Sequence, residues 1–353
     1  MTLPTEPIGS IPRPQALIDG MRAAGEGRLA PEALEGLFDD AVRDTLRRFE
    51  ETGSPVVTDG EQRKQSFATY PIAGLTNLAP GGVTIPFADG HTRQLPVLSE
   101  GPFRYATQAW SYIDEARPHT DATFKQAVIS ASALSLLYPG DGLPGYPREA
   151  FIEDLVREAS DEIRGCLDRG ADVQIDFTEA RLSLKLDPSG GLLNAFVDLN
   201  NQVLGELTDD QRARVGVHTC PGGDRDSTHS ADVPYENLLS SLFRLNVGKF
   251  FVQLASEADR PHVLAVLGEH ARDGRRIFVG VIDPLNPRVE TAEEVRDQVL
   301  QAARFIGPDR IGTTDDCGFS PFGDDTSTSR DTAFDKIRAR VEGTELASSI
   351  LGV

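Results

Sequence analysis

The residues best suited to chemistry in this chain are a histidine and a cysteine separated by one threonine, His218 and Cys220. They end a short run at 215–220 that begins with β-branched and small residues, which predicts a strand. Side chains two positions apart in a strand point to the same face, so both could bind one metal ion. Imidazole nitrogen and thiolate sulfur together favour zinc over magnesium, calcium or manganese.

A second cysteine, Cys317, adds a third ligand of the right type. It lies in a polar segment at 313–319, again directly after a strand-like apolar run. A His-x-Cys pair alone is common in proteins without metal, but a cysteine in the same local setting elsewhere strengthens the interpretation. The sequence therefore predicts a Zn²⁺ site made by His218, Cys220 and Cys317.

The composition narrows the class of protein. Hydrophobic residues make up 39% of the 353 residues, which is enough for a sizeable core. The formal net charge of -20 would repel phosphate backbones and anionic lipids, so we expect neither nucleic acid nor a membrane as a partner. Three cysteines do not suit a disulfide framework, and no signal peptide is recognisable, so we expect a cytoplasmic protein. The sequence is compatible with a homo-oligomer.

Eight strand-like segments lie along the chain, and from the fourth onward they alternate regularly with helices. This alternation indicates parallel neighbours, and eight such units predict an α/β fold of the (β/α)8 TIM barrel type in one domain over 1–353. Short alternating segments at about 70–120 predict a β-rich insertion between the second and third strands. The strands are expected near residues 8, 57, 128, 175, 216, 252, 280 and 311, and the helices at about 15–25, 31–52, 149–169, 193–206, 234–244, 260–273 and 291–305.

Polar residues gather just past these predicted strands. In a TIM barrel the strand ends that feed the helices form one rim, and active sites lie on that rim. The sequence therefore predicts that the chemistry is collected at one end of the barrel. The residues concerned are Ser10, Glu61, Asp176, Glu179, His218, Cys220, Glu257, Asp283 and Cys317.

These motifs carry a resemblance to a known family. The chain resembles the catalytic C-terminal half of cobalamin-independent methionine synthase and its shorter single-barrel relatives, which include zinc-dependent epoxyalkane:coenzyme M transferases. The similarity extends over nearly the whole chain. The matching segments are Ile8-Gly9-Ser10, Asp59-Gly60-Glu61, Gln174-Ile175-Asp176, His218-x-Cys220 and Cys317-Gly318.

The resemblance implies a zinc-dependent methyltransferase that acts on homocysteine, with roles for particular residues. Ser10 and nearby backbone would hold the amino acid carboxylate, whereas Glu61 and Asp176 would bind the amino group. Glu179, the second carboxylate after the same strand, is assigned with them to substrate binding. Asp283 matches an aspartate after the seventh strand, and we take it with Asp176 as a candidate catalytic residue. His218, Cys220 and Cys317 match three residues that bind zinc in the family, so the resemblance implies that they are zinc ligands here.

The chain departs from the family pattern at two positions. A glutamate that is a further zinc ligand in the family aligns with Ala255, and we predict that Glu257, two residues on, substitutes for it. A surface charge is the alternative interpretation of Glu257. A histidine that assists methyl transfer aligns with Leu285. Only the catalytic half of the longer enzymes is matched, which leaves the methyl donor open between a methyl-tetrahydrofolate and another donor.

The remaining polar residues are interpreted without a function. The other histidines, including His91 and His229, have no partners at ligand spacing and are taken as surface or core residues. Asp324 and Asp325 are interpreted as a solvated loop, although their place beyond Cys317 could put them at the rim.

The predicted reaction is alkyl transfer to a zinc-activated thiol. Zinc removes the proton from a thiol that is mostly protonated at neutral pH and keeps its sulfur reactive. Glu61 and Asp176 supply negative charge suited to an ammonium group, which favours homocysteine over a sulfonate thiol. The alternatives are transfer of another alkyl group to a different small thiol, a closed structural zinc site, and a non-catalytic protein that binds or senses thiols through zinc.

Overall fold

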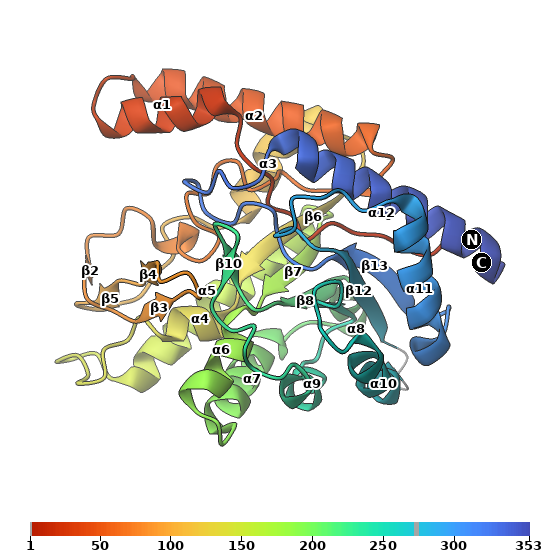
Figure 1. The fold of residues 1–353 in the computed structure, drawn as a ribbon. Coiled ribbons are helices and arrows are strands. Elements are labelled where there is room, and N and C mark those ends of the chain that lie inside the picture. Colours follow the sequence, from red (N-terminus) through yellow and green to blue (C-terminus); the bar gives the residue numbers. More distant parts are fainter. Residues whose placement is uncertain (1, 272–274) are drawn as a thin grey trace.

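The computed structural model describes residues 2–271 and 275–353, and its centre is a curled sheet of seven parallel strands (Figure 1). Neighbouring strands pair in the order β1-β6-β7-β8-β11-β12-β13, so that each central strand is hydrogen-bonded to a parallel strand on both of its edges. The α/β architecture predicted from the sequence is confirmed. The strands are β1 (Val56–Val57), β6 (Thr123–Ile129), β7 (Asp172–Asp176), β8 (Val215–Thr219), β11 (Lys249–Val252), β12 (Arg276–Ile282) and β13 (Ile311–Asp315).

The first predicted strand, near residue 8, is not a regular strand in the structure. Thr5 forms a single parallel bridge with Thr313 of β13, and the Glu6 N–H donates to the Thr313 carbonyl at 3.0 Å. Further along, the Ile11 N–H donates to the Gly60 carbonyl at 3.0 Å, just past β1. The segment therefore lies between the two outer strands of the sheet. Its prolines, at 4, 7, 12 and 14, lack N–H donors and prevent a continuous ladder.

Helices surround this sheet, and those with predicted bounds lie within a few residues of them. Thr291 shows why one of them starts where it does, since its side chain and Glu294 cap each other's backbone N–H groups at the start of α11. The predicted end of the 260–273 helix lies outside the described residues. The helices that match predictions are α1 (Gln15–Gly25), α2 (Pro31–Glu51), α5 (Arg148–Asp168), α7 (Gly191–Leu204), α9 (Glu236–Leu242), α10 (Arg260–His270) and α11 (Ala292–Ile306).

Further short helices follow the strands or fill the connections, and the sequence pattern did not predict them. Among them α6 starts at Glu179, so this predicted site residue lies in the first turn of a helix. Within the described part of the chain, no helix is long and apolar enough to cross a membrane. These helices are α3 (Trp110–Ala116), α4 (Ala131–Ser135), α6 (Glu179–Leu186) and α8 (Asp209–Ala213), and the chain ends in the long helix α12 (Arg330–Leu351).

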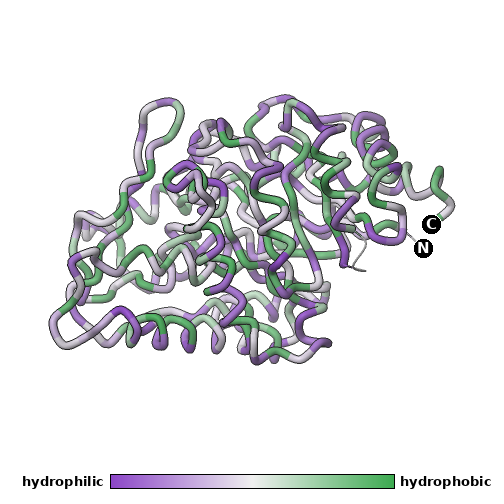
Figure 2. The backbone as a smooth tube through the Cα atoms, turned by 90° about the horizontal axis from the view of Figure 1, so that it is seen from below, coloured by the Kyte–Doolittle hydropathy of each residue, from purple (hydrophilic) through white to green (hydrophobic). Residues whose placement is uncertain are grey.

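The core lies between the sheet and the helices. In β12, Ile277, Val279 and Val281 are fully buried, as expected for a parallel strand covered on both faces. Hydrophobic and hydrophilic stretches alternate along the outer helices (Figure 2), which agrees with helices that bury one face. Burial of this apolar surface is the main term that stabilises the fold.

The β-rich insertion lies where it was predicted, between β1 and β6. It contains two small antiparallel sheets, one of β2 (Leu78–Ala79) with β5 (Val97–Leu98) and one of β3 (Thr84–Pro86) with β4 (Thr92–Gln94). Both lie to one side of the barrel (Figure 1). The β3–β4 hairpin is joined to a second small hairpin, β9 (Gly223–Asp224) with β10 (Ser227–Thr228), because the Ala88 N–H donates to the Thr228 carbonyl at 2.9 Å.

Candidate active site

His218, Cys220 and Cys317 come together at the ends of two strands. His218 lies in β8, Cys220 directly follows that strand, and Cys317 lies two residues past β13. One ligand atom from each residue lies within 4.8 Å of the other two, and the two sulfur atoms are 3.2 Å apart. We call these residues the sulfur–imidazole group. Their residue types and spacing suit a single small cation.

Among the described residues, the imidazole of His218 has no alternative hydrogen-bond partner. Both ring nitrogens are buried, and neither hydrogen-bonds to any of the described residues. A buried polar atom without a partner costs free energy, so such atoms normally receive a ligand. Two sulfurs beside an unpartnered imidazole are a donor set that fits zinc.

The two thiols influence each other. The pKa of Cys317 is held well below its usual value because its sulfur accepts a hydrogen bond from the Cys220 thiol. The same hydrogen bond, together with burial, raises the pKa of Cys220. One thiolate is therefore already favoured at this site, and thiolate is the form that binds metal.

The chain turns sharply after Cys220 to keep the sulfur in place. Gly222 has a φ of 71°, and its N–H donates to the Cys220 sulfur at 3.4 Å. A Cβ at Gly222 would lie 1.7 Å from Nε2 of His229, so only glycine fits. His229 itself is buried, and burial lowers the pKa of its imidazole to about 4.

Glu257 does not join this group, and the prediction that it replaces the family's glutamate ligand is not supported. Its Oε1 lies 2.8 Å from Nη1 of Arg181, whose side chain is only 2% exposed. The loop after β11, which carries Glu257, is held in place by Asp316. The Asp316 carboxylate accepts hydrogen bonds from the backbone N–H groups of Leu254 and Ala255, both at 2.8 Å. Glu257 is thus a partner of a buried arginine, and it lies outside the group of described residues whose ligand atoms come together.

A cavity of about 310 Å³ opens beside the sulfur–imidazole group. Both polar and apolar side chains line it, and the insertion supplies part of its wall. Its polar lining includes Ser10, Glu61, Asp176, Glu179, His218 and Cys317, and its apolar lining includes Phe67, Ile85, Phe87, Ile129, Leu134, Leu182 and Phe322. Most of the residues expected at the rim therefore share one cavity.

Glu61 is held by a lysine that the sequence analysis did not single out. The Nζ of Lys64 lies 2.9 Å from Oε1 of Glu61 and also donates to the Ala127 carbonyl at 2.8 Å. Burial alone would lower the pKa of Lys64, but Glu61 and Asp59 outweigh it and raise that pKa. Glu61 has a φ of 56°, so its backbone is in a conformation that non-glycine residues rarely adopt, as often occurs at functional sites.

Asp176 ends β7, directly beside His218 of the neighbouring strand. Its Oδ1 accepts a hydrogen bond from Nε2 of Gln174 at 2.8 Å, and the same amide nitrogen donates to the Ile8 carbonyl at 3.0 Å. Burial raises the pKa of Asp176 to about 6. Asp176 therefore presents a carboxylate to the cavity that one backbone-anchored amide holds in position.

Glu179 lies in the first turn of α6 and also lines the cavity. Its Oε1 accepts hydrogen bonds from the hydroxyls of Ser130, at 2.5 Å, and Ser132. Its Oε2 is buried and has no hydrogen-bond partner in the described part of the chain. Burial raises the pKa of Glu179 to about 7. We call Glu61, Asp176 and Glu179 the carboxylate group.

Ser10 lies on the irregular N-terminal segment, at the wall of the cavity. Its Oγ accepts a hydrogen bond from the Ser320 N–H at 3.2 Å, and its carbonyl accepts one from the Phe319 N–H at 3.0 Å. A Cβ on Gly318 would meet the Ser10 hydroxyl at 2.0 Å, so the chain after Cys317 passes very close to Ser10. This contact positions the serine next to the sulfur–imidazole group.

Asp283 is not among the residues that line the cavity. Its Oδ1 accepts a hydrogen bond from the Leu285 N–H at 3.0 Å, and its carbonyl oxygen accepts one from Nζ of Lys336 at 3.0 Å. The aspartate therefore shapes its own loop, and the prediction of a catalytic role for it is not supported by its position. That loop places Leu285 close to Gly223. The Cys317 sulfur lies close to the same glycine.

The sequence analysis missed several residues around the cavity. Lys64 follows Glu61 by three positions, but pairing across a turn was not considered. Asp316 directly precedes Cys317. Its role in holding the loop after β11 is visible only in the folded structure. His229 was interpreted as a surface or core residue, yet it lines the cavity, and the periodicity of the sequence carries no signal for that.

Comparisons with known proteins agree with this geometry. A family model described as the catalytic domain of cobalamin-independent synthase matches residues 3–330. The chain is 26% identical over 353 residues to a methionine synthase of Saccharolobus solfataricus, covering 98% of this chain and 94% of the relative. It is 25% identical over 359 residues to a methionine synthase of Sulfurisphaera tokodaii, covering 98% and 92%.

Among solved structures, the chain is similar to a B12-independent methionine synthase from Shewanella sp. W3-18-1, determined in complex with selenomethionine. The TM-score is 0.77 with 20% sequence identity, and each chain is covered over 100% of its length. This likeness confirms the TIM-barrel-like fold that the strand order indicates.

Proposed function

Because the chain belongs to the cobalamin-independent synthase family, we propose that it is a zinc-dependent S-methyltransferase that converts homocysteine to methionine. Methionine synthase relatives along nearly the whole chain make it a methyltransferase enzyme. The use of zinc, the identity of the thiol and the methyl donor are parts of our proposal. The observation that carries it is the sulfur–imidazole group at the wall of the cavity, in which both buried ring nitrogens of His218 lack a hydrogen-bond partner among the described residues.

His218, Cys220 and Cys317 would hold the zinc ion. Zinc bound there would supply Lewis acidity that keeps a substrate thiol in its thiolate form at neutral pH. Three protein ligands leave one position of a tetrahedral site for the substrate sulfur. A closed structural site would instead need a fourth protein ligand, and among the described residues the group contains three.

The carboxylate group would select the rest of the thiol substrate. Asp176 presents its carboxylate beside His218, so an ammonium group a few atoms from the metal-bound sulfur would meet a negative charge. Glu61, already paired with Lys64, would add hydrogen-bond acceptors at the same end. Arg93 also lines the cavity, but its guanidinium is paired with Asp224 and Asp324, which disfavours a sulfonate thiol.

The apolar lining residues of the cavity would accept the methyl donor. Phe67, Phe87 and Phe322 line it together with aliphatic side chains, which suits a flat, partly apolar group such as the ring system of a methyl-tetrahydrofolate. Packing of that group would exclude water from the reacting carbon and sulfur atoms.

Single-turnover measurement of methionine formation tests the proposal. Purified zinc-loaded protein is mixed with homocysteine and methyl-tetrahydrofolate carrying one or three glutamates, and methionine is quantified. We expect stoichiometric methionine with at least one donor. The parallel reaction with 2-mercaptoethanesulfonate in place of homocysteine should give no methylated thiol, and preference for that thiol would favour transfer to a different thiol.

A non-catalytic thiol sensor is the second candidate, because the apolar side chain of Leu285 and the Cys317 sulfur approach the same glycine, Gly223, where a proton-transferring group would be useful. In the same experiment a sensor would bind homocysteine through zinc and form no methionine with any donor. Homocysteine binding without turnover would therefore overturn the enzymatic proposal and favour the sensor.

A further inference from the structure

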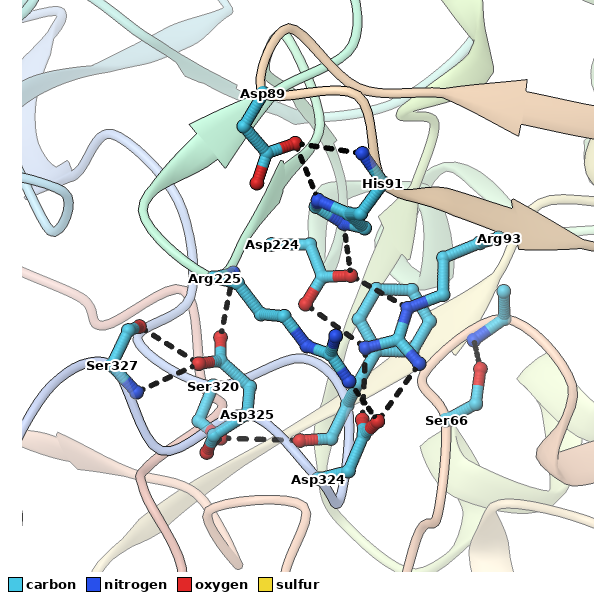
Figure 3. A network of polar contacts seen from close by, with 12 residues as sticks. Ser66, Asp89, His91, Arg93, Asp224, Arg225, Ser320, Asp324, Asp325 and Ser327 are labelled. Carbon is cyan, nitrogen blue, oxygen red and sulfur yellow. Dashed lines mark hydrogen bonds and ion pairs between the residues drawn. The ribbon is translucent and has the colours of Figure 1, made fainter.

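The insertion contacts both loops that follow the cysteines of the sulfur–imidazole group. Arg93 of β4 lies between them (Figure 3). Its Nε donates to Oδ2 of Asp224 at 2.6 Å and its Nη2 to Oδ1 of the same residue at 3.1 Å. Its Nη1 and Nη2 also reach the two carboxylate oxygens of Asp324, at 3.1 and 2.8 Å. One guanidinium thus bridges two carboxylates, each in bidentate fashion.

The two aspartates come from the two sulfur-bearing loops. Asp224 follows Cys220 by four residues in β9, and Asp324 follows Cys317 by seven. The Asp224 side chain is 0% exposed, and Arg93 also covers the ring of Phe322 at 4.1 Å from its centroid. A buried carboxylate that loses its cation is costly, so this pairing restrains the loop strongly.

Movement of Asp224 would be transmitted directly to the sulfurs. Gly223, its neighbour, lies against Cys317, since a Cβ built there would be 3.7 Å from the Cys317 sulfur. Gly222, one residue earlier, donates its N–H to the Cys220 sulfur. Asp224 therefore directly follows two glycines that contact the sulfurs, Gly223 at Cys317 and Gly222 at Cys220.

Further contacts hold the same hairpin on the same loops. Nε2 of His91 lies 3.0 Å from Oδ2 of Asp224, and Nδ1 of His91 lies 2.6 Å from Oδ1 of Asp89. The Asp89 N–H donates to the Ser227 hydroxyl at 3.2 Å. Nη2 of Arg225 lies 2.5 Å from Oδ2 of Asp324, which links the two loops once more.

We propose that the β3–β4 hairpin acts through Arg93 as a clamp that holds the loops after Cys220 and Cys317 in the arrangement that a metal ion requires. This inference rests on the proposed function, because it assumes that the sulfur–imidazole group binds zinc. Arg93 is a positioning residue, since its contacts reach the sulfurs only through the loops. The insertion is thereby a working part of the metal site, and it does more than extend the wall of the cavity.

The test compares zinc affinity in full-length variants by competition with a chromogenic chelator. Arg93→Ala should weaken zinc binding about 10- to 100-fold, the usual range for groups that orient metal ligands. Arg93→Lys, which keeps the charge but cannot bridge two carboxylates, should recover only part of that loss. Asp224→Asn combined with Arg93→Ala should cost little more than either change alone, because both break the same contact.

Arg104 provides the matched control. It also lies in the insertion and also pairs with two carboxylates, those of Asp154 and Glu158, but on α5. Arg104→Ala should leave zinc affinity unchanged. Cobalt substitution gives a second readout, because the visible spectrum of the bound ion reports the ligand geometry, and it should change in Arg93→Ala and not in Arg104→Ala.

The outcomes separate this inference from the proposed function. Wild-type protein that binds no zinc would contradict both. If the wild-type protein binds zinc tightly and Arg93→Ala changes the zinc affinity by less than about twofold, with an unchanged cobalt spectrum, the clamp is contradicted. The proposed function would stand. If Arg93→Ala does not fold, Asp324→Asn serves instead, since the Asp324 side chain is 51% exposed and its change removes one arm of the clamp. Unchanged zinc affinity in that variant would equally contradict the inference.

Discussion

The sulfur–imidazole group and the carboxylate group line the same cavity, but they differ in how far the protein satisfies their polar atoms. Both ring nitrogens of His218 are buried without a hydrogen-bond partner in the part of the chain that the structure describes. By contrast, Glu61 is paired with Lys64, and one carboxylate oxygen of Glu179, Oε1, accepts hydrogen bonds from two serine hydroxyls. Asp176 accepts one from Gln174.

The difference indicates what each group is built to bind. Donor atoms left without partners in a buried place are stabilised only when an ion occupies the site, so metal binding should be strong there. Carboxylates that are already hydrogen-bonded keep their orientation in the empty cavity, and they gain a modest further interaction when a substrate ammonium arrives. Changes in the first group should therefore have much larger effects than changes in the second.

The largest effect is expected for Cys317→Ser. Loss of one sulfur ligand should weaken zinc binding by at least about 100-fold, because changes in groups that merely orient ligands already cost 10- to 100-fold. The zinc content of the purified protein measures this. Cys166→Ala is the matched control, since Cys166 is buried in α5 apart from the group and its change should keep zinc content at the wild-type level. Full zinc occupancy in Cys317→Ser would remove this cysteine from the site.

Asp176→Asn should act on the substrate and leave zinc in place. We expect kcat/KM for homocysteine to fall about 10- to 100-fold, which corresponds to the loss of one hydrogen bond between charged groups. The comparison substrate is 4-mercaptobutyrate, which has the same thiol but no ammonium group. If the mutation slows both substrates equally, the carboxylate does not recognise the amino group.

Glu179→Gln should change how stability depends on pH. Burial raises the pKa of Glu179 to about 7 in the folded state, so between its usual pKa and about 7 the folded protein keeps a proton that the unfolded chain has lost. Unfolding then releases a proton, and the free energy of unfolding falls as pH rises through this window, by at most about 1.4 kcal/mol per pH unit. The glutamine variant should lose this slope in denaturant titrations at several pH values. A variant with the wild-type slope would show that Glu179 titrates normally.

The smallest effect on the metal is expected for Glu257→Gln. Because the Glu257 carboxylate pairs with Arg181, zinc affinity should stay within about twofold of the wild-type value, in contrast to the 10- to 100-fold cost of changes around a ligand. Chelator competition measures it alongside Cys317→Ser. A loss of zinc affinity as large as that of Cys317→Ser would make Glu257 a candidate ligand again. The metal site would then extend beyond the sulfur–imidazole group.

The sequence was sufficient for features that depend on local pattern. Alternating apolar runs and amphipathic stretches placed seven strands and seven of the helices, and a His-x-Cys pair at a strand end located part of the sulfur–imidazole group. The N-terminal segment was less predictable, since its apolar residues suggested a strand while its prolines prevent regular pairing. Local pattern thus predicts elements better than it predicts how the sheet closes.

Features that depend on long-range pairing could not be predicted in this way. Glu257 was chosen as a ligand by strand alternation, but the strand ends at Val252 and Arg181 of α6 takes the carboxylate. Arg93 lies more than 130 residues from Asp224 and more than 230 from Asp324, so no local pattern joins them. Asp283 followed a predicted strand as expected, yet its carboxylate is used within its own loop.

X-ray absorption at the zinc edge, recorded with and without homocysteine, tests the central claim most directly. We predict about one zinc per chain with two sulfur ligands at about 2.3 Å and one imidazole nitrogen at about 2.0 Å. Addition of homocysteine should raise the sulfur count from two to three. Stoichiometric zinc whose sulfur count stays at two in saturating homocysteine, or a protein without zinc, would contradict the account.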